Sequence, residues 1–399
     1  MTGAPALAVP PPPFLADPAL AAILDALPLA RLVGGCVRDT LAGRPVADID
    51  LATPDTPDAV VAALRAAGLK WAPTGLKHGT VTAISAHRGF EITTLRRDLE
   101  TDGRHAEVAW TDDWREDAAR RDFTINAMSM ARDGTVFDYF DGIPDLRAGR
   151  VAFVGDPAAR IAEDYLRVLR FFRFHARYGT GAPDPATLAA LRRAVPGLSR
   201  LSPERVWSEL KRILLAPDPA GSVRLMAELG VLQAILPEAA AAEALARLIE
   251  AGAPADPILR LAALAPGDSA GLAERLRLST AERTRLEDLA GPAPDPSLDG
   301  AALRRALADT PGDVLIGRSW LAHGREGAAL RDRLAATPRP RFALAGRDAL
   351  ALGVPPGPRV GKLVRAVREW WLEGGCLADP AACRAELARL LRDFAGEPD

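Results

Sequence analysis

Residues 32–53 read LVGGCVRDTLAGRPVADIDLAT, which places a sharp turn, a helix start and two closely spaced carboxylates within one short segment. The mostly apolar run at 29–33 predicts a buried strand. Gly34 and Gly35 follow it and allow the backbone to turn sharply and approach a ligand closely. A helix starting after the glycines would point its free N–H groups at that ligand, and Arg38 adds a cation whose fork suits phosphate. The segment therefore predicts a phosphate site.

The same stretch ends in a pair of carboxylates, Asp48 and Asp50. In a strand, residues two apart point to one face, so these two would stand side by side while Ile49 and Leu51 face the core. Adjacent carboxylates repel unless cations lie between them, and Mg²⁺ is the usual ion where phosphates are nearby. A pair of solvated aspartates in a loop is the alternative interpretation. The phosphate turn upstream favours the metal site.

Taken together, the pattern LVGGxVRDxLxGRxxxDxD resembles the signature of the polymerase-β-like nucleotidyltransferase superfamily. More narrowly, it resembles the bacterial tRNA nucleotidyltransferase and poly(A) polymerase family, which includes the class II CCA-adding enzymes. The resemblance implies two Mg²⁺ ions held by Asp48 and Asp50. It also implies contacts to the nucleotide triphosphate from Gly34, Gly35 and Arg38.

Composition limits the class of protein. The chain has 399 residues, 48% of them hydrophobic and 26% charged, which is typical of a soluble protein with more than one domain. The net charge is −2, so any nucleic-acid partner would be held by a local basic surface. The three cysteines form no CxxC pair and favour reduced thiols in a cytoplasmic protein. Neither a signal peptide nor an apolar run of membrane-spanning length is recognisable, so no membrane partner is expected.

The segment 54–94 predicts a helix followed by a hairpin. Residues 56–67 are amphipathic and are followed by Gly68, which predicts a helix. Earlier in the chain, Asp17 with Pro18 predicts the start of a helix at 18–27. The runs at 80–84 and 90–94 alternate in polarity, with Arg88-Gly89 expected in the turn between them. Glu91 lies on the second strand and is the candidate third carboxylate of the site, for metal or hydroxyl contact. An outward-facing strand glutamate is the alternative.

Residues 96–114 are polar around Gly103 and predict a mobile loop. The family carries a Tyr-Arg-x-Pro stretch in this region, whereas Gly103 to Glu107 read GRHAE here. This departure leaves the exact product open. His78, in the preceding turn, is interpreted as a structural histidine.

The second motif is REDAARRDFTINAMSM at 115–130. It resembles the family's RRDFTxNA, in which the second arginine, matching Arg121, contacts the nucleotide triphosphate. Two adjacent arginines are also plausible anion donors on chemical grounds. A solvated ion pair is the alternative and stays open for Arg120, while Asp122 is expected to orient one of the two arginines. The apolar members from Phe123 onward should be buried.

The third motif is RIAEDYLRVLRFFRF at 160–174, which no proline or glycine interrupts and which therefore predicts one helix. Asp164 and Arg167 would be neighbours on it. Together they make an edge that matches cytosine and adenine but mismatches uracil and guanine. An ordinary helix ion pair is the alternative, and the family's EDxxRxxRxxRF pattern favours the base-reading role. Arg170 and Arg173 continue the spacing as nucleotide-binding candidates, although Arg173 would point away and support the phosphates or the domain junction.

The rest of the chain predicts helices, broken at 217–219, 237, 252–257, 291–297 and 337–340. Ser202 with Pro203 forms a helix start. Arginines on these helices could hold an RNA backbone or form a solvated face; they are Arg275, Arg277, Arg283, Arg285, Arg304 and Arg305. Trp370 and Trp371 are assigned to the core, with base stacking as the alternative. The stretch GPRVGK from 357 is interpreted as a helix entry because no strand precedes it.

The predicted fold is α+β, with a polymerase-β-like nucleotidyltransferase head built on a small mixed sheet and an all-α C-terminal arm. The predicted segments are an N-terminal extension and helix at 1–27, the head at 28–148, a helical neck at 149–216 and an all-helical body and tail at 217–399. The resemblance implies addition of CCA to tRNA 3′ ends from CTP and ATP. A poly(A) polymerase or a partial CC- or A-adding enzyme is the nearest alternative. A non-catalytic RNA-binding scaffold and a small-molecule nucleotidyltransferase belong to other classes.

Overall fold

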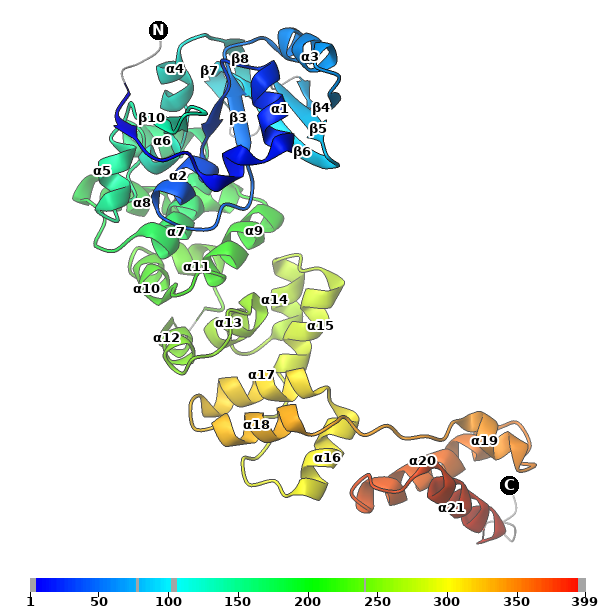
Figure 1. Cartoon of the computed structure of the whole chain (residues 1–399). Helices are drawn as coiled ribbons and strands as arrows, with labels where there is room; N and C mark the ends of the chain where they lie inside the picture. The colour runs from blue at the N-terminus through cyan, green and yellow to red at the C-terminus, as the bar shows by residue number, and fades with distance from the viewer. Residues whose placement is uncertain (1–4, 77–78, 102–105, 240–241, 394–399) are drawn as a thin grey trace. The chain divides into compact units, whose positions relative to one another are not determined.

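The computed structural model describes residues 5–76, 79–101, 106–239 and 242–393. The chain divides into two compact units, Met1–Pro237 and Glu238–Asp399, which run from blue to green and from green to red in Figure 1. The first combines a mixed sheet with helices, and the described part of the second contains helices alone, so the predicted α+β class is confirmed. The finer boundaries at 148 and 216 fall inside the first unit and stay predictions.

The sheet of the first unit has the order β1-β10-β9-β2-β3-β6-β5-β4. All neighbours are antiparallel except β3 and β6, which run parallel. The strands are β1 (Leu7–Ala8), β2 (Arg31–Val33), β3 (Asp50–Thr53), β4 (Lys70–Gly75), β5 (Thr80–Ser85), β6 (Arg88–Thr94), β9 (Ser129–Met130) and β10 (Thr135–Phe137). Because β2 and β3 are central, the glycine turn and the aspartates lie at the middle of the sheet.

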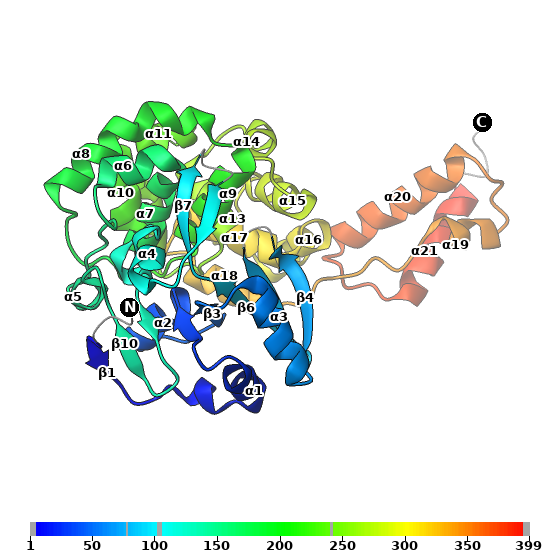
Figure 2. The same ribbon diagram turned by 90° about the horizontal axis from the view of Figure 1, so that it is seen from above.

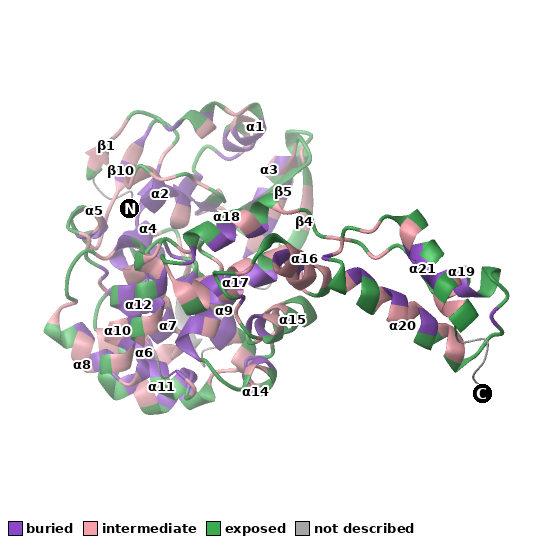
Figure 3. Ribbon diagram, turned by 90° about the horizontal axis from the view of Figure 1, so that it is seen from below, coloured by how far each residue is buried: buried purple, intermediate pink, exposed green. Residues whose placement is uncertain are grey.

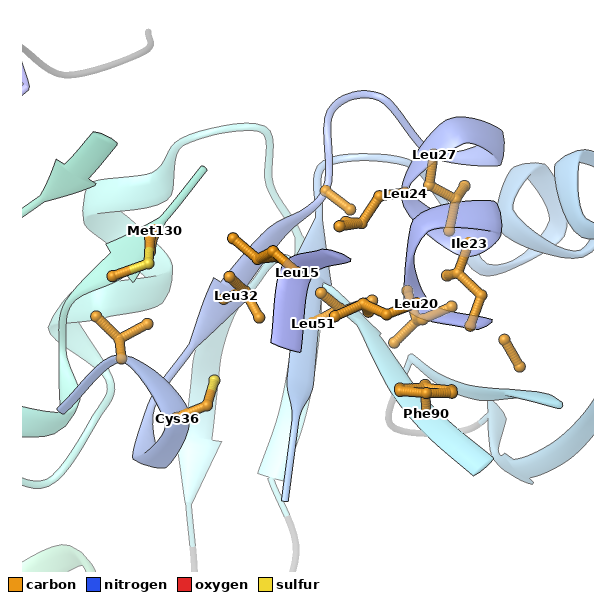
Figure 4. Close-up of a cluster of buried hydrophobic side chains, with 14 of the residues drawn as sticks. Leu15, Leu20, Ile23, Leu24, Leu27, Leu32, Cys36, Leu51, Phe90 and Met130 are labelled. Atoms are coloured by element: carbon orange, nitrogen blue, oxygen red, sulfur yellow. The ribbon is translucent and has the colours of Figure 1, made fainter. Parts of the chain in front are cut away.

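The core of this unit lies between the sheet and its helices. Figure 4 shows Leu51 of β3 beside Leu20 of α1 (Pro18–Ala26), and Leu32 of β2 beside Leu15, in one cluster of buried side chains. Leu51 is 1% exposed, as expected for the apolar residue that follows Asp50 and faces the core. Asp17 caps α1 by accepting from the Ala19 N–H, which confirms the predicted start.

Further helices of the first unit cover the sheet or follow it. They are α2 (Gly35–Leu41), α3 (Pro57–Ala66), α4 (Trp114–Ala119), α5 (Gly142–Arg147), α6 (Pro157–Glu163), α7 (Leu166–Tyr178), α8 (Pro185–Ala194), α9 (Pro203–Leu214), α10 (Ala220–Glu228) and α11 (Val231–Ile235). The short 3-10 segments are η1 (Pro13–Ala16), η3 (Thr124–Asn126) and η4 (Val195–Arg200). The predicted starts at Thr56 and Ser202 are confirmed, although Ser202 makes no side-chain cap hydrogen bond.

Two expectations about turns and loops were wrong. The hairpin turn between β5 and β6 is Ala86-His87, both with positive φ, and Arg88 and Gly89 belong to β6. The segment 96–114 is no simple loop, because β7 (Arg96–Thr101) pairs antiparallel with β8 (Ala106–Trp110), and β7 lies beside α4 (Figure 2). Its composition gave no alternating apolar pattern, so the pairing was not visible in the sequence. Residues 102–105, which follow β7 in the sequence, and the predicted structural His78 lie outside the described residues.

The predicted single helix at 160–174 was also wrong, since α6 ends at Glu163 and α7 begins at Leu166. Asp164 has extended backbone angles, with φ −154° and ψ 109°, and its Oδ1 accepts from the Leu166 N–H at 3.0 Å. A short acidic side chain competes for backbone N–H groups in this way and favours helix starts. The break turns α7 relative to α6, and this matters for the residues predicted to read the base.

The predicted helix breaks at 252–257, 291–297 and 337–340 are confirmed in the second unit, and those at 217–219 and 237 at the end of the first. Its helices are α12 (Ala242–Glu250), α13 (Pro257–Leu264), α14 (Ser269–Arg275), α15 (Thr280–Leu289), α16 (Gly300–Asp309), α17 (Gly312–His323), α18 (Ala328–Ala336), α19 (Gly346–Ala351), α20 (Pro358–Glu373) and α21 (Pro380–Asp393). Gly357 is the N-cap of α20, so the glycine-rich stretch is a helix entry. Trp371 is buried, but Trp370 is 37% exposed and was wrongly assigned to the core.

Candidate active site

The glycine turn joins β2 to α2. Gly34 has φ +69°, a conformation that glycine adopts without strain. A Cβ at this position would lie 3.2 Å from Nη1 of Arg121, so the turn also makes room for that guanidinium. Most of α2 is buried (Figure 3), including Cys36, Val37, Arg38 and Asp39. The fold therefore brings Gly34 and Arg121 into contact, although they lie more than eighty positions apart in the sequence.

The carboxylates gather at the start of β3. Asp50 is the first residue of this strand and is in parallel register with Glu91 of β6. Burial raises the pKa of Asp50, and the charges of Glu91 and then Asp48 raise it further, against the opposing effect of Arg121. The predicted third carboxylate thus stands beside Asp50. Asp48 precedes the strand instead of sharing it, because β3 does not extend that far.

These carboxylates fit a divalent cation that phosphate helps to bind. Repulsion among Asp50, Glu91 and Asp48 is relieved by positive charge between them. Within the described residues, no group of three or more His, Cys, Asp or Glu side chains is assembled at metal-binding distances. Mg²⁺ is commonly bound through one or two carboxylates together with substrate phosphates and water. The donor set therefore suits an ion that arrives with a nucleotide.

Arg38 is buried and donates three hydrogen bonds to two neighbouring side chains. Its Nε and Nη2 donate to Asp39 at 3.2 and 3.1 Å, and its Nη1 donates to Oδ1 of Asn126 at 2.5 Å. Tyr178 of α7 donates its hydroxyl to the same Asp39. Arg38 is 8% exposed and lines the cleft, so it is a fixed cation in the cleft wall rather than a mobile side chain.

The arginine pair of the second motif follows α4. Arg120 and Arg121 both donate to Asp117, at 2.8 and 3.1 Å. Asp122, expected to orient one of this pair, instead accepts from Nε of Arg170 on α7 at 2.7 Å and from Nδ2 of Asn126 at 3.0 Å. Burial acts to raise the pKa of Asp122, but the charge of Arg170 and these hydrogen bonds hold it below its usual range.

Asp164 and Arg167 do not form the helix ion pair that their spacing suggested. Oδ2 of Asp164 accepts from Nη2 of Arg205 at 2.8 Å. Nη1 of Arg167 donates to the carbonyl of Arg160 at 2.7 Å and to Glu163. The break between α6 and α7 separates the two side chains from each other while both still line the cleft.

Arg173 lies apart from this group. Its Nη1 donates to Oε1 of Glu209 on α9 at 3.0 Å, and it is not among the residues that line the cleft. Burial lowers its pKa to about 10, against the charge of Glu209, which raises it. This position agrees with the expectation that Arg173 points away from the base-reading residues.

The cleft itself has a volume of about 510 Å³ and contains most of the predicted residues. Those lining it are Gly34, Gly35, Arg38, Asp50, Arg120, Arg121, Asp122, Asn126, Asp164, Leu166, Arg167, Arg170, Phe174 and Arg205. Four residues in or next to the cleft were not predicted from the sequence: Asn126, Asp117, Glu163 and Arg205. Asn126 stood in the quoted motif, but nothing local indicated that Arg205, at a helix start, would reach Asp164.

Comparison with known proteins places this cleft in a family. Residues 30–152 match the model of the poly A polymerase head domain, and residues 182–243 match a model described as "Probable RNA and SrmB- binding site of polymerase A". CCA tRNA nucleotidyltransferase 1, mitochondrial, of Danio rerio is 38% identical over 361 residues, or 86% of this chain and 83% of the relative. This chain belongs to the CCA tRNA nucleotidyltransferase family.

Further members of the CCA tRNA nucleotidyltransferase family are similar to this chain over most of its length. The CCA-adding enzyme of Lacticaseibacillus paracasei is 32% identical over 85% of this chain and 87% of its own length. The crystal structure of the Bacillus stearothermophilus CCA-adding enzyme in complex with CTP superposes with a TM-score of 0.77 at 28% identity. That comparison covers 94% of this chain and 98% of the other. The similarity therefore extends over both units and not only over the head.

Proposed function

We propose that this protein adds CCA to the 3′ ends of tRNA from CTP and ATP, with release of pyrophosphate and without a nucleic-acid template. The observation that carries the proposal is the single cleft that places Asp50, beside Glu91, together with Arg121, Asp164 and Arg167. Membership in the CCA tRNA nucleotidyltransferase family over most of the chain supports it.

Asp48 and Asp50 would hold the divalent metal, with Glu91 beside them as a further ligand or as a contact to the attacking hydroxyl. When bound, two Mg²⁺ ions would lower the pKa of the RNA 3′-hydroxyl and neutralise the leaving pyrophosphate. The protein's own contribution is alignment. Gly34 and Gly35 leave space for phosphate, and Arg121 stands directly over that turn.

The remaining arginines add fixed positive charge around the triphosphate. Arg38 is held by Asp39 and Asn126, and Arg170 is held by Asp122, so neither guanidinium has to be ordered when a nucleotide binds. Such preorganised charge is the main catalytic device in phosphoryl transfer. Arg173 is bound to Glu209, so it would hold α7 against α9 and would not contact the nucleotide.

Asp164 and Arg167 would read the base. A carboxylate accepts at several lone pairs and an arginine has five N–H donors, so the hydrogen bonds already made leave capacity for a ligand. Asp164 can accept a hydrogen bond from the amino group of cytosine or adenine, while Arg167 donates a hydrogen bond to the ring nitrogen beside it. Uracil and guanine present the opposite order and would leave buried groups unpaired, at about 1–3 kcal/mol each.

Other functions fit less well. A poly(A) polymerase or a partial CC- or A-adding enzyme would use the same residues, and the product decides among them. A non-catalytic RNA-binding scaffold would have no use for the charges of Glu91 and Asp48 beside Asp50, which help burial to raise the pKa of Asp50. A small-molecule nucleotidyltransferase is disfavoured by the match of residues 182–243 to an RNA-binding model.

A cytoplasmic location is proposed from the unpaired cysteines. The relatives in zebrafish and human are named as mitochondrial, so location among compartments stays a prediction. Within the described residues, none of the helices combines the length and apolar character needed to cross a membrane.

The direct test is incubation of purified protein with Mg²⁺, radiolabelled CTP and a tRNA transcript that lacks its terminal CCA. We expect labelled CMP on the tRNA and an equal amount of pyrophosphate. Binding of the tRNA without incorporation would instead support the RNA-binding scaffold.

A further inference from the structure

One buried carboxylate, which contacts two of the arginines that line the cleft, has no predicted role. Asp117 lies on α4 and is 2% exposed. Its Oδ1 accepts from Nε of Arg120 at 2.8 Å and from the backbone N–H of Arg96 at 3.4 Å. Its Oδ2 accepts from Nη2 of Arg121 at 3.1 Å. A single buried negative charge therefore contacts two adjacent guanidiniums and the first residue of β7.

This arrangement fixes one edge of the Arg121 guanidinium. Nη2 is bound to Asp117, and Nη1 donates to the carbonyl of Asn126 at 3.4 Å and lies over Gly34. The side chain of Arg121 is 18% exposed, on the side of the cleft. Charge-assisted hydrogen bonds that a guanidinium donates to a buried carboxylate are short and directional, so they set both the position and the plane of the guanidinium.

Asp117 also offsets the repulsion between the two arginines. Adjacent guanidiniums on a tight turn repel each other, and each would move toward water without an anion between them. Burial acts to raise the pKa of Asp117, but Arg121 and Arg120 hold it below its usual range, so the side chain is charged at neutral pH. Arg160 secures the same turn from the other side, donating to the carbonyl of Arg121 at 2.8 Å.

We propose that Asp117 is a positioning residue that holds Arg121 in the plane needed to bind the triphosphate of the incoming nucleotide. It would act on substrate binding through Arg121 and would not touch the nucleotide itself. This inference rests on the proposed function, because it assigns Arg121 to the triphosphate.

The test is a double-mutant cycle on the full-length protein, using Asp117→Asn, Arg121→Lys and the double variant. We would measure the KM and kcat for CTP on a tRNA lacking CCA, and the Kd for CTP with Mg²⁺ by calorimetry. Asp117→Asn should raise the KM about tenfold, as loss of one charge-assisted hydrogen bond does, with a smaller change in kcat. Because both residues act through one guanidinium, the KM and Kd for CTP of the double variant should be no higher than those of the more impaired single variant.

A matched control separates positioning from stability. Asp145 on α5 is also buried, at 4% exposed, and accepts from Thr124 and from Arg150 at 2.6 Å, but does not line the cleft. Asp145→Asn should lower the melting temperature and leave the KM for CTP unchanged. If Asp117→Asn does not fold, Asp117→Glu replaces it, since the longer carboxylate keeps the charge but displaces Arg121 and should also raise the KM.

An unchanged KM and Kd in a folded Asp117 variant would overturn the proposal, as would effects of Asp117→Asn and Arg121→Lys that multiply. If Arg121→Lys itself changes neither value, Arg121 does not bind the triphosphate and the inference fails with it. If the wild-type protein transfers no nucleotide, the proposed function fails, and the calorimetric Kd values still decide the role of Asp117.

Discussion

At the scale of single residues, the cleft is built from arginines whose partners come from distant parts of the chain. Arg170 is held by Asp122, and Arg205 holds Asp164. The resemblance of three separate motifs to one family predicted which residues would gather. The pairings between them depend on how α7 and α9 pack and could not be predicted from spacing, as the incorrect pairing of Asp164 with Arg167 illustrates.

Asp50→Asn should reduce nucleotide transfer by at least about a thousandfold, because the proposed metal ligand at the start of β3 would lose the charge that attracts Mg²⁺. Asp48→Ala should have the same effect, and since Asp48 is exposed the fold should be retained. Transfer rates at several Mg²⁺ concentrations, with circular dichroism as the folding control, check this. Full activity in either variant would remove the proposed metal site.

Arg167→Ala should loosen base choice more than it slows transfer. Without its donors, the cleft no longer penalises uracil and guanine, so the preference for C and A should fall by roughly tenfold or more. Arg177→Ala is a suitable control, since this arginine lies on the same helix but is exposed and outside the cleft. Competition between CTP and UTP on one tRNA measures the ratio, and an unchanged ratio would refute the base-reading role.

At the scale of elements, the site depends on how the segment around η3 is fixed to α2 through Asn126 and to α7 through Asp122. The helix starts after Asp17, Thr56 and Ser202 were predictable because proline at the first helical position is a local signal. The break between α6 and α7 was not, because no glycine or proline marks it. At this break the Asp164 side chain accepts from the N–H of Leu166, the first residue of α7, and is in turn held by Arg205 from a later helix.

Gly142→Ala should destabilise the first unit by roughly 1–3 kcal/mol through overpacking. A Cβ there would lie 2.3 Å from the carbonyl oxygen of Thr124, a backbone atom of η3 that cannot move without shifting Asn126. Gly221 of α10 has open space around its Cβ position, so Gly221→Ala should be neutral or slightly stabilising. Urea unfolding of both variants checks the difference, and equal stabilities would contradict it.

The ion pair of Asp122 with Arg170 should make stability depend on acid pH. The pKa of Asp122 in the fold is lowered from 3.8, so its contribution is fully present above that value and is lost as the pH falls through the lower folded pKa. Asp122→Asn should therefore be less stable at pH 7 and show a shallower loss of stability on acidification. Unfolding free energies measured from pH 7 to pH 2 test this, and an unchanged slope would contradict it.

At the scale of the whole molecule, the chain consists of an α+β unit and a helical unit, and each was predictable to a different degree. The three motifs identified the first unit and its chemistry. The second was predictable only as helices between prolines and glycines, because its arginines have no local signal for RNA. Several of them bind neighbouring carboxylates instead, as Arg275 does with Glu238 and Arg285 with Asp313.

The most direct test of the central claim is the sequence of the product. Purified protein with Mg²⁺, CTP and ATP would be incubated with tRNAs that end before CCA, after C and after CC, and the extended 3′ ends would be sequenced. We expect each tRNA to be completed to CCA and then left unchanged. A growing A tail, an incomplete CC end or no extension of any of the three would contradict the proposed function.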